Sequence, residues 1–327
     1  METVGGLWAR YRALILSRVS PGTGRAYAAA WRTRVGPTFS ERAIESLTPL
    51  DIEAAFAGWS GARSTRVDAL ACLSAICRVA VKGGFIVSNP CVGVEIPRAR
   101  EYEPRARALT VTEVRRFLEV VEGFPAPYRR FLLAKLYTGC RFGEVAGMRV
   151  TDVDIDGGTI WISRTASPGF QGRMNIGPTK GRRSRRVPIP AQLIPVLREA
   201  AAGKGPHDLM FPGPRGGYLN SKNLSRAVNW PKVRESIKTF PPEQPPLHFH
   251  DLRHTAADVL FQAGASAPDV QAILGHSSLA VTQLYADTRA EAARRGAAAL
   301  TAFYLAQSKS QLGGGEAPAM TGSDSPA

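Results

Sequence analysis

His250-Asp251-Leu252-Arg253-His254-Thr255, continued by Leu274-Gly275-His276 and then Tyr285, is the stretch around which the rest of the chain is organised. Three imidazoles, a guanidinium and a phenol fall within 36 residues, with His250 and Arg253 one helical turn apart and Tyr285 nine residues after His276. Groups of these types can bind a phosphate and supply a hydroxyl nucleophile. The stretch therefore predicts phosphate chemistry that needs no metal ion.

The overall composition favours a folded protein that attracts polyanions. The chain has 327 residues, enough for two domains, and its 42 Lys and Arg against 27 Asp and Glu give a formal charge of +15. Such a balance is typical of proteins that bind nucleic acid. It also occurs where basic residues are only solvated, so charge alone leaves both interpretations open.

The cysteines and the N-terminus bear on the compartment. Cys72, Cys77, Cys91 and Cys140 lack the paired spacing of a metal site, so we expect reduced, buried thiols. The N-terminus shows no signal-peptide pattern, and no run of 18 apolar residues could cross a bilayer. We therefore expect a cytoplasmic protein with no membrane role.

Residues 1–97 predict a helical domain, because apolar residues recur there at helical spacing. Thr48-Pro49-Leu50-Asp51 is the start signal of a helix that runs to about Trp59. Ser64 to Val81 carry a second helical stripe, which Gly83-Gly84 ends. The aromatic residues of this domain are expected in its core rather than on a base-stacking surface.

A linker is expected at residues 98–108, where prolines and alternating charges show no apolar period. We place a second domain at residues 109–307 and a disordered tail at 308–327. Within the second domain, Thr159–Ile162 and Arg186–Ile189 are predicted strands among helices. The fold class is therefore mostly α, with a small antiparallel β-sheet in the second domain.

Arg141 and Glu144 open a predicted helix, after a helix from Tyr128 to Tyr137 that ends at Gly139. Their spacing of three places them on one face. One interpretation is a surface ion pair of small energy. The other is a phosphate-binding arginine that Glu144 holds in place.

A basic run separates the two predicted strands, with five basic residues in Lys180–Arg186. It could face a phosphate backbone, or it could protect an edge strand from aggregation. No other lysine lies between Lys135 and Lys204, so Lys180 is the candidate for any chemistry that needs an amine here. The preceding loop, Thr165 to Pro178, could contain an added strand at Arg173–Ile176.

These motifs, taken together, resemble those of the tyrosine recombinase family, the phage-integrase type of site-specific DNA recombinase. The resemblance covers roughly residues 7 to 290. It implies two domains, a helical core-binding domain that contacts DNA and an α+β catalytic domain. The matching segments, in chain order, are Thr138-Gly139-Cys140-Arg141-Phe142-Gly143-Glu144, Thr179-Lys180, the stretch His250 to Thr255, and Leu274-Gly275-His276-Ser277-Ser278 running on to Tyr285.

The resemblance also implies a chemical role for each matching residue. Tyr285 would attack the scissile phosphorus to give a 3′-phosphotyrosyl link, with His250 as general base. Arg141 and Arg253 would hold the non-bridging oxygens. Lys180 would protonate the departing 5′-oxygen. No metal and no cofactor would then be needed.

Other residues receive supporting roles. His276 would donate a further hydrogen bond to the phosphate, and Glu144 would orient Arg141. His248 and His254 match no role in the family and are expected to be structural. The basic run would contact DNA through Arg182, Arg183 and Arg185.

The implied partner is double-stranded DNA at specific sites. The family usually acts as four protomers on two sites, each passing its C-terminal helix to a neighbour, and residues 290–305 are the candidate segment here. We expect a site-specific recombinase. Two alternatives stay open, a catalytically silent DNA-binding protein and a type IB topoisomerase, which shares the chemistry.

Overall fold

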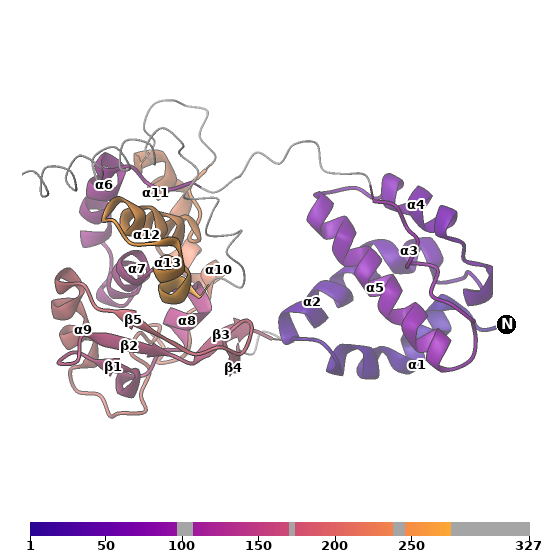
Figure 1. The fold of residues 1–327 in the computed structure, drawn as a ribbon, viewed down its shortest axis with the longest axis horizontal. Coiled ribbons are helices and arrows are strands. Elements are labelled where there is room, and N and C mark those ends of the chain that lie inside the picture. The colour runs from indigo at the N-terminus through magenta and orange to yellow at the C-terminus, as the bar shows by residue number, and fades with distance from the viewer. Residues whose placement is uncertain (97–106, 170–173, 238–245, 276–327) are drawn as a thin grey trace, which may run out of the picture. The chain divides into compact units, whose positions relative to one another are not determined.

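The computed structural model describes residues 1–96, 107–169, 174–237 and 246–275. Its contacts divide the chain into two compact units, Met1–Ala256 and a unit that begins at Ala257. Residues 1–96 form a helical segment of the first unit, and residues 107–256 surround small sheets (Figure 1). The expected tail and the segment 290–305 lie outside the described residues, as do residues 98–106 of the expected linker.

The helical segment has its own apolar core. Trp8 stacks on Trp31 with ring centroids 5.0 Å apart, and Phe39 meets Trp59 edge to face at 6.3 Å. These rings pack with the buried aliphatic residues of the segment, so the prediction of core aromatics is confirmed. Its helices are α1 (Val4–Ser17), α2 (Pro21–Ala30), α3 (Gly36–Phe39), α4 (Pro49–Gly58) and α5 (Arg63–Lys82), with a π turn at Trp31–Val35 and a 3-10 turn at Ile44–Ser46.

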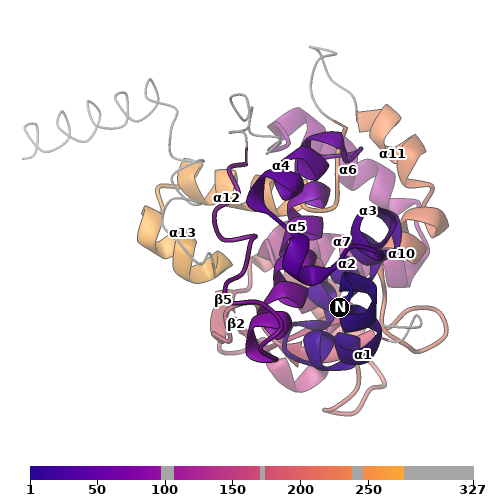
Figure 2. The same ribbon diagram turned by 90° about the vertical axis from the view of Figure 1, so that its right-hand side faces the viewer.

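The helix ends predicted for this segment are confirmed. Thr48 accepts a hydrogen bond from the Asp51 amide at 3.2 Å, and Asp51 accepts one from the Thr48 amide at 3.0 Å, which closes the capping box of α4. α5 extends one residue beyond each predicted end. α4 and α5 run beside one another in two views (Figures 1 and 2).

Helices dominate the rest of the described chain. The helix predicted from Tyr128 to Tyr137 extends from Ala126 to Thr138, and the helix predicted to open at Arg141 has this residue as its N-cap. α11 is an addition; it starts at Trp230, and Pro231 is tolerated in its first turn. The helices are α6 (Val111–Glu122), α7 (Ala126–Thr138), α8 (Phe142–Ala146), α9 (Ile194–Ala201), α10 (Ser221–Ala227), α11 (Trp230–Ile237), α12 (Asp251–Gln262) and α13 (Ala267–Leu274), with 3-10 turns at Val150–Asp152 and Ala191–Leu193.

The predicted strands pair in an antiparallel sheet of order β1 (Val153–Asp154), β2 (Thr159–Ile162) and β5 (Arg185–Pro188). Ile160 pairs with Val187, and both side chains are buried. On the opposite face Arg186 lies over the Trp161 ring at 5.5 Å. Successive side chains of a strand point to opposite faces, so Arg185 and Arg186 have different surroundings.

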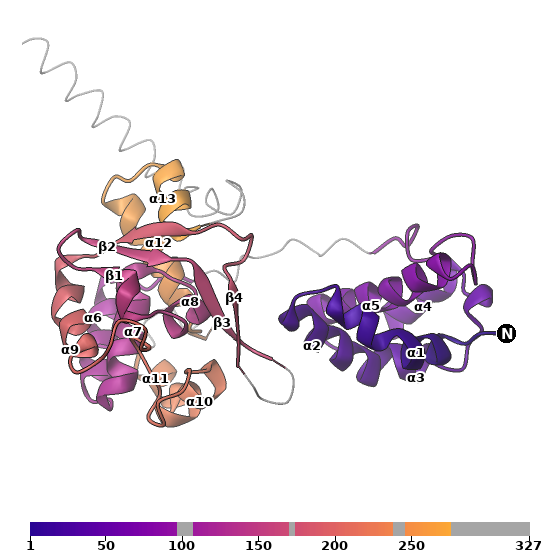
Figure 3. The ribbon, with the colours of Figure 1, turned by 90° about the horizontal axis from the view of Figure 1, so that it is seen from below.

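A second ribbon corrects the prediction of a loop from Thr165 to Pro178. β3 (Arg164–Pro168) pairs antiparallel with β4 (Met174–Pro178), and α8 lies against β3 (Figure 3). The possible strand at Arg173–Ile176 corresponds to β4. β3 was not predicted, because Thr165-Ala166-Ser167 lacks the β-branched and aromatic alternation of a typical strand.

The predicted boundary at residue 108 needs a local correction. Arg107 is buried and forms an ion pair with Glu113, which also caps α6 through the Thr110 amide at 2.8 Å. The Leu109 amide donates to the Thr255 hydroxyl at 2.9 Å. Residue 107 is therefore part of the folded structure rather than of an extended linker.

The unit that begins at Ala257 is described as far as Gly275. Ala257 and Phe261 on α12 pack with Val270 and Leu274 on α13, and the two helices lie side by side (Figures 1 and 2). Ser266 and Asp269 form a capping box at the start of α13, and Gly275 ends this helix in the left-handed conformation. Across the described parts of the chain, no helix is both long and apolar enough to cross a membrane.

Candidate phosphate-binding site

Arg141 lies at the N-cap of α8 and is held by Glu144. The Arg141 amide donates to one carboxylate oxygen at 2.8 Å, and its guanidinium donates to the other at 2.9 Å. The Glu144 side chain has no exposed surface, whereas a quarter of the Arg141 side chain is exposed. The interpretation as a surface ion pair is therefore wrong, because the buried carboxylate of Glu144 orients the Arg141 guanidinium.

Arg185 on β5 is the second partner of Glu144. Its two terminal nitrogens donate to the two carboxylate oxygens at 3.1 and 2.7 Å, a bidentate geometry, and its side chain is 9% exposed. We predict from the basic run that Arg185 contacts DNA. The structure instead gives its guanidinium a protein partner, and this separates it from Arg182 and Arg183.

The two arginines decide the charge state of Glu144. Burial alone would raise the pKa of this carboxyl. Hydrogen bonds and charge from Arg185, together with the Arg141 amide and guanidinium, outweigh burial and bring its pKa below the ordinary value. Glu144 is therefore ionised at neutral pH and balances part of the positive charge around it.

Arg253 on α12 approaches from the other side of the chain turn that precedes Arg141. It is 2% exposed and donates to the Gly139 carbonyl at 2.9 Å. Gly139 ends α7 with a φ of 62°, a conformation that glycine adopts without strain. Burial, followed by the charge of Arg141, lowers the pKa of Arg253 to about 10, so it stays charged at neutral pH.

Close packing of α8 on β3 fixes where Arg141 sits. A Cβ on Gly143 would lie 2.4 Å from the carbonyl oxygen of Ala166 and 2.4 Å from the Thr165 hydroxyl. Neither distance is possible for a real side chain. The glycine therefore permits the helix that begins after Arg141 to rest directly on the strand.

His250 precedes α12 and lies near the two arginines. Its ring meets that of His254 at 4.8 Å, edge to face. Burial of part of the ring, then the charges of His254, Lys135, Arg253 and Arg141, hold the pKa of His250 below its usual range. Because the residue is exposed on one side, solvent weakens this effect. Its direction keeps the imidazole neutral near pH 7, the form that can accept a proton.

The other two histidines of this region make local contacts. The His248 amide donates to Asp251 at 2.6 Å, and its imidazole nitrogen lies 3.6 Å from the same carboxylate, which begins α12. His254 is half-buried, and burial followed by the charge of Arg253 lowers its pKa to about 4. Both observations agree with the structural roles expected for them.

Lys180 lies in the turn after β4 and is exposed. Gly181 and Arg182 have φ values of 86° and 56°, and the Arg182 amide donates to the Thr179 carbonyl at 2.8 Å. The structure brings Arg141, Arg253 and His250 together, and Lys180 lies on the turn that follows β4.

His276 and Tyr285 lie outside the described residues, so their predicted roles stay predictions.

A groove beside His250 is lined by α10 and the start of α11, with Trp230 at its floor. Lys222, Arg226 and Arg234 give this groove a positive rim. It was not predicted, because nothing in the sequence of α10 marks it as a neighbour of His250.

Lys135 on α7 is a residue of this site that the sequence analysis did not assign. It is fully buried, and its ammonium donates to the Cys140 carbonyl at 3.3 Å. A signal exists, because Lys135 falls on a helix whose neighbouring positions Leu132 and Leu136 are apolar. A charged residue inside such a stripe is unusual.

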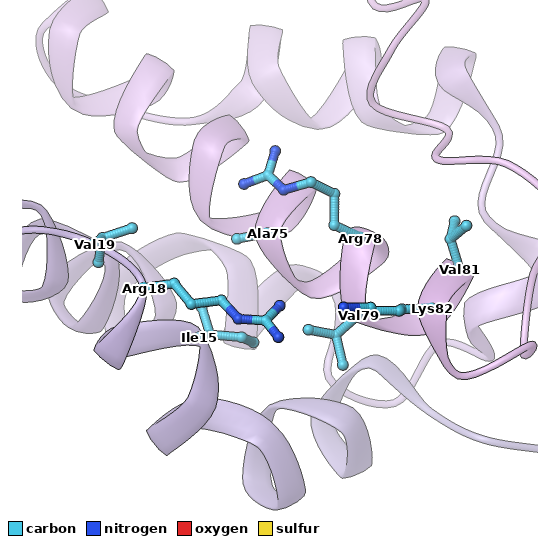
Figure 4. Close-up of a pocket in the computed structure, with 8 residues that line it drawn as sticks. All are labelled: Ile15, Arg18, Val19, Ala75, Arg78, Val79, Val81 and Lys82. Carbon is cyan, nitrogen blue, oxygen red and sulfur yellow. The ribbon is translucent and has the colours of Figure 1, made fainter.

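A separate groove lies in the helical segment between the C-terminal ends of α1 and α5. Ile15 and Val79 form its apolar floor, and Arg18, Arg78 and Lys82 surround it with exposed cations (Figure 4).

The described residues contain no group of three or more His, Cys, Asp or Glu arranged to hold a metal ion. All four cysteines are free, and Cys91 is only half-buried, unlike the expectation for it.

Comparison with known proteins decides the family. The model of the phage integrase family matches residues 107–292, more than half of the chain. The chain belongs to the phage integrase family. Among relatives, it is 30% identical over 276 residues to the integrase of Mycobacterium phage FRAT1, an alignment that covers 81% of this chain and 78% of the relative.

The chain is also similar to a tyrosine recombinase and to solved integrase structures. The tyrosine recombinase XerC of Xylella fastidiosa strain 9a5c is 29% identical over 209 residues, and the alignment spans 63% of each protein. A solved structure of the Tn1549 transposon integrase in complex with a circular intermediate DNA matches with a TM-score of 0.71 at 19% identity, covering 90% of this chain and 100% of that one. A lambda integrase dimer bound to a COC′ core site matches with a TM-score of 0.63 at 21% identity, covering 85% and 96%. These structures confirm the mostly helical fold with small antiparallel sheets.

Proposed function

We propose that this phage integrase family member is a site-specific DNA recombinase that cleaves and rejoins strands through a 3′-phosphotyrosyl intermediate. The observation that carries the proposal is the pair Arg141 and Arg253, both fixed by protein partners beside the neutral His250. Cations held in place before substrate binds stabilise the charge that develops on a phosphate without further reorganisation.

A named residue is proposed to carry out each step of the reaction. Tyr285 attacks the scissile phosphorus, and its proton passes to His250. The guanidinium groups of Arg141 and Arg253 bind the non-bridging oxygens. Lys180, exposed on the turn after β4, delivers a proton to the departing 5′-oxygen. His276 donates the remaining hydrogen bond to the phosphate.

Double-stranded DNA is the proposed partner of both folded parts. The formal charge of +15 favours it, as do the cation-lined grooves beside His250 and between α1 and α5. Arg182 and Arg183, exposed next to Lys180, are proposed to contact its backbone. The domain limits of the sequence analysis, with the second domain beginning at residue 107, are part of this proposal.

We also propose assembly on DNA as a tetramer with exchange of residues 290–305. Lambda integrase has been solved as a tetramer bound to a Holliday junction, and that structure matches this chain with a TM-score of 0.62 at 21% identity. The test is truncation after Asp287. If helix exchange activates cleavage, the truncated chain cleaves more slowly than the full chain; equal rates and extents would contradict it.

The test of the main proposal is covalent trapping in EDTA. Randomly nicked genomic DNA from cells that carry the gene is incubated with the protein, and denatured adducts are collected and their DNA ends sequenced. We expect recurrent 3′ ends at a defined site and no adduct with Tyr285→Phe. An adduct that Tyr285→Phe leaves unchanged, or none with the unaltered chain, would refute the assignment.

The two alternatives give different results in the same system. A catalytically silent DNA-binding protein would retain site-specific DNA without any covalent link. A type IB topoisomerase would relax supercoiled plasmid but give no exchange between two copies of the recovered site. Products of exchange between two labelled sites are the outcome that separates a recombinase from both.

A further inference from the structure

Lys135 is a fully buried lysine on α7. Its side chain has no exposed surface, and its hydrogen-bond acceptor is the neutral Cys140 carbonyl. Among the described residues no carboxylate lies within ion-pair distance of its ammonium. Burying a charge without an ionic partner costs several kcal/mol. An aliphatic side chain such as methionine would fill the same space on α7 without this cost.

Charged groups of both signs surround Lys135. Burial, then the charge of Arg253, lowers the pKa of Lys135 to about 8, while Cys140 and the acids Glu144 and Asp251 act in the opposite sense. The lysine therefore stays largely protonated at pH 7. Its charge in turn opposes protonation of His250 and His254. An anion bound near Lys135 and Arg253 would relieve the repulsion between these two cations.

The hydrogen bond of Lys135 also acts on the chain turn that carries Arg141. Cys140 directly precedes Arg141, and its carbonyl is the acceptor for the Lys135 ammonium. The neighbouring Gly139 carbonyl is the acceptor for Arg253. Two buried cations from different helices thus hold successive peptide groups of this turn.

We propose that Lys135 is a positioning residue of the phosphate site, which fixes the turn before Arg141 through the Cys140 carbonyl and adds a buried positive charge beside this turn. It touches neither substrate nor the reacting atoms. The inference rests on the proposed function for its effect on DNA cleavage, but its effect on His250 can be measured without DNA.

The first measurement is an NMR titration of His250 in the full chain. Its ring signal is assigned from its loss in His250→Gln and followed with pH in the unaltered protein, Lys135→Met and Lys135→Gln. Both variants remove the charge, and glutamine retains a donor for the Cys140 carbonyl. We expect the pKa of His250 to rise in both by roughly half a unit or more, as is usual when a nearby like charge is removed.

The second measurement compares cleavage with stability. On a nicked duplex of the site recovered by covalent trapping, we expect the rate of adduct formation to fall about tenfold or more in Lys135→Met, since a buried charge near the phosphate is lost. The midpoint of thermal unfolding at pH 7 should be unchanged or higher, because a buried unpaired charge is removed. A purely structural lysine would lower rate and stability together.

Lys204→Met is the matched control. Lys204 is half-buried, and its ammonium also donates to a main-chain carbonyl, that of Met210 at 2.9 Å, but its charged neighbours are Arg130 and Asp208. This variant should leave both the His250 titration and the cleavage rate unchanged. An unmoved His250 pKa in both Lys135 variants would overturn the inference, and so would a loss of stability in both. Absence of any adduct with the unaltered chain would instead refute the proposed function.

Discussion

Two groups of basic residues in the phage integrase fold contrast sharply. Arg141, Arg185 and Arg253 are directed inward and bonded to Glu144 or to a main-chain carbonyl. Lys180, Arg182 and Arg183 project from an exposed turn, and the described residues offer them no ionic partner. Fixed cations stabilise a transition state, whereas solvated ones can move to meet a ligand. The first group should therefore govern stability and rate together, and the second should govern rate and DNA affinity alone.

The largest effect should come from removing the acid shared by the inward group. Glu144→Ala removes the buried carboxylate that binds Arg141 and Arg185, so we expect the free energy of unfolding to fall by roughly 3–5 kcal/mol in urea titrations. Glu122→Ala is the control, because it breaks an exposed pair with Arg129 and should change the value by less than about 1 kcal/mol. Equal effects would mean that burial of the acid has no importance.

Next in size is the loss of a guanidinium fork. Arg253→Lys keeps a positive charge but cannot bind a phosphate in the same planar geometry, so adduct formation on the recovered site should slow roughly a hundredfold. Arg130→Lys, at a surface pair with Glu199, should cleave at the normal rate. A rate within twofold of normal for Arg253→Lys would remove this residue from the reaction.

A substitution of Lys180 tests the exposed group of cations on the turn after β4. Lys180→Ala should slow cleavage by roughly a hundredfold through loss of a proton donor, with unfolding unchanged within about 0.5 kcal/mol. A duplex whose leaving 5′-oxygen is replaced by sulfur needs no proton donor, and cleavage of it should be restored. If the sulfur substrate shows the same defect, Lys180 does not act as the acid.

The free energy of unfolding of the chain at low pH should depend on Glu144. Because its folded pKa is depressed, its contribution is complete above the unfolded pKa of about 4.3 and is lost as pH falls through the folded value. Urea titrations at a series of pH values below 5 should show a smaller decline for Glu144→Gln than for the unaltered chain. Parallel declines would assign the acid sensitivity to other carboxyl groups.

The smallest effects are expected for the exposed arginines. Arg182→Ala and Arg183→Ala should weaken binding to all DNA sequences alike and should each reduce the salt dependence of log K by about one. Arg185→Ala should differ from both by destabilising the fold. A change of sequence preference in either exposed variant would indicate base recognition instead of phosphate contact.

The same contrast explains what could be predicted from the sequence. The helix start at Thr48 was predicted correctly, because a capping box depends on side chains three residues apart. Arg185 was grouped with its neighbours because inward and outward positions of a short strand are fixed by its register with β2. Lys135 was not assigned, since its importance depends on α12, which is distant in sequence. His276 and Tyr285 rest on the sequence pattern alone.

The contact between Gly143 and β3 also couples two distant pieces of chain mechanically. With the first turn of α8 resting on the main chain of Ala166, a tilt of the β3–β4 ribbon cannot be absorbed by a side chain between them. Any side chain at position 143 would push the start of α8 away from β3 and would displace Arg141 with it.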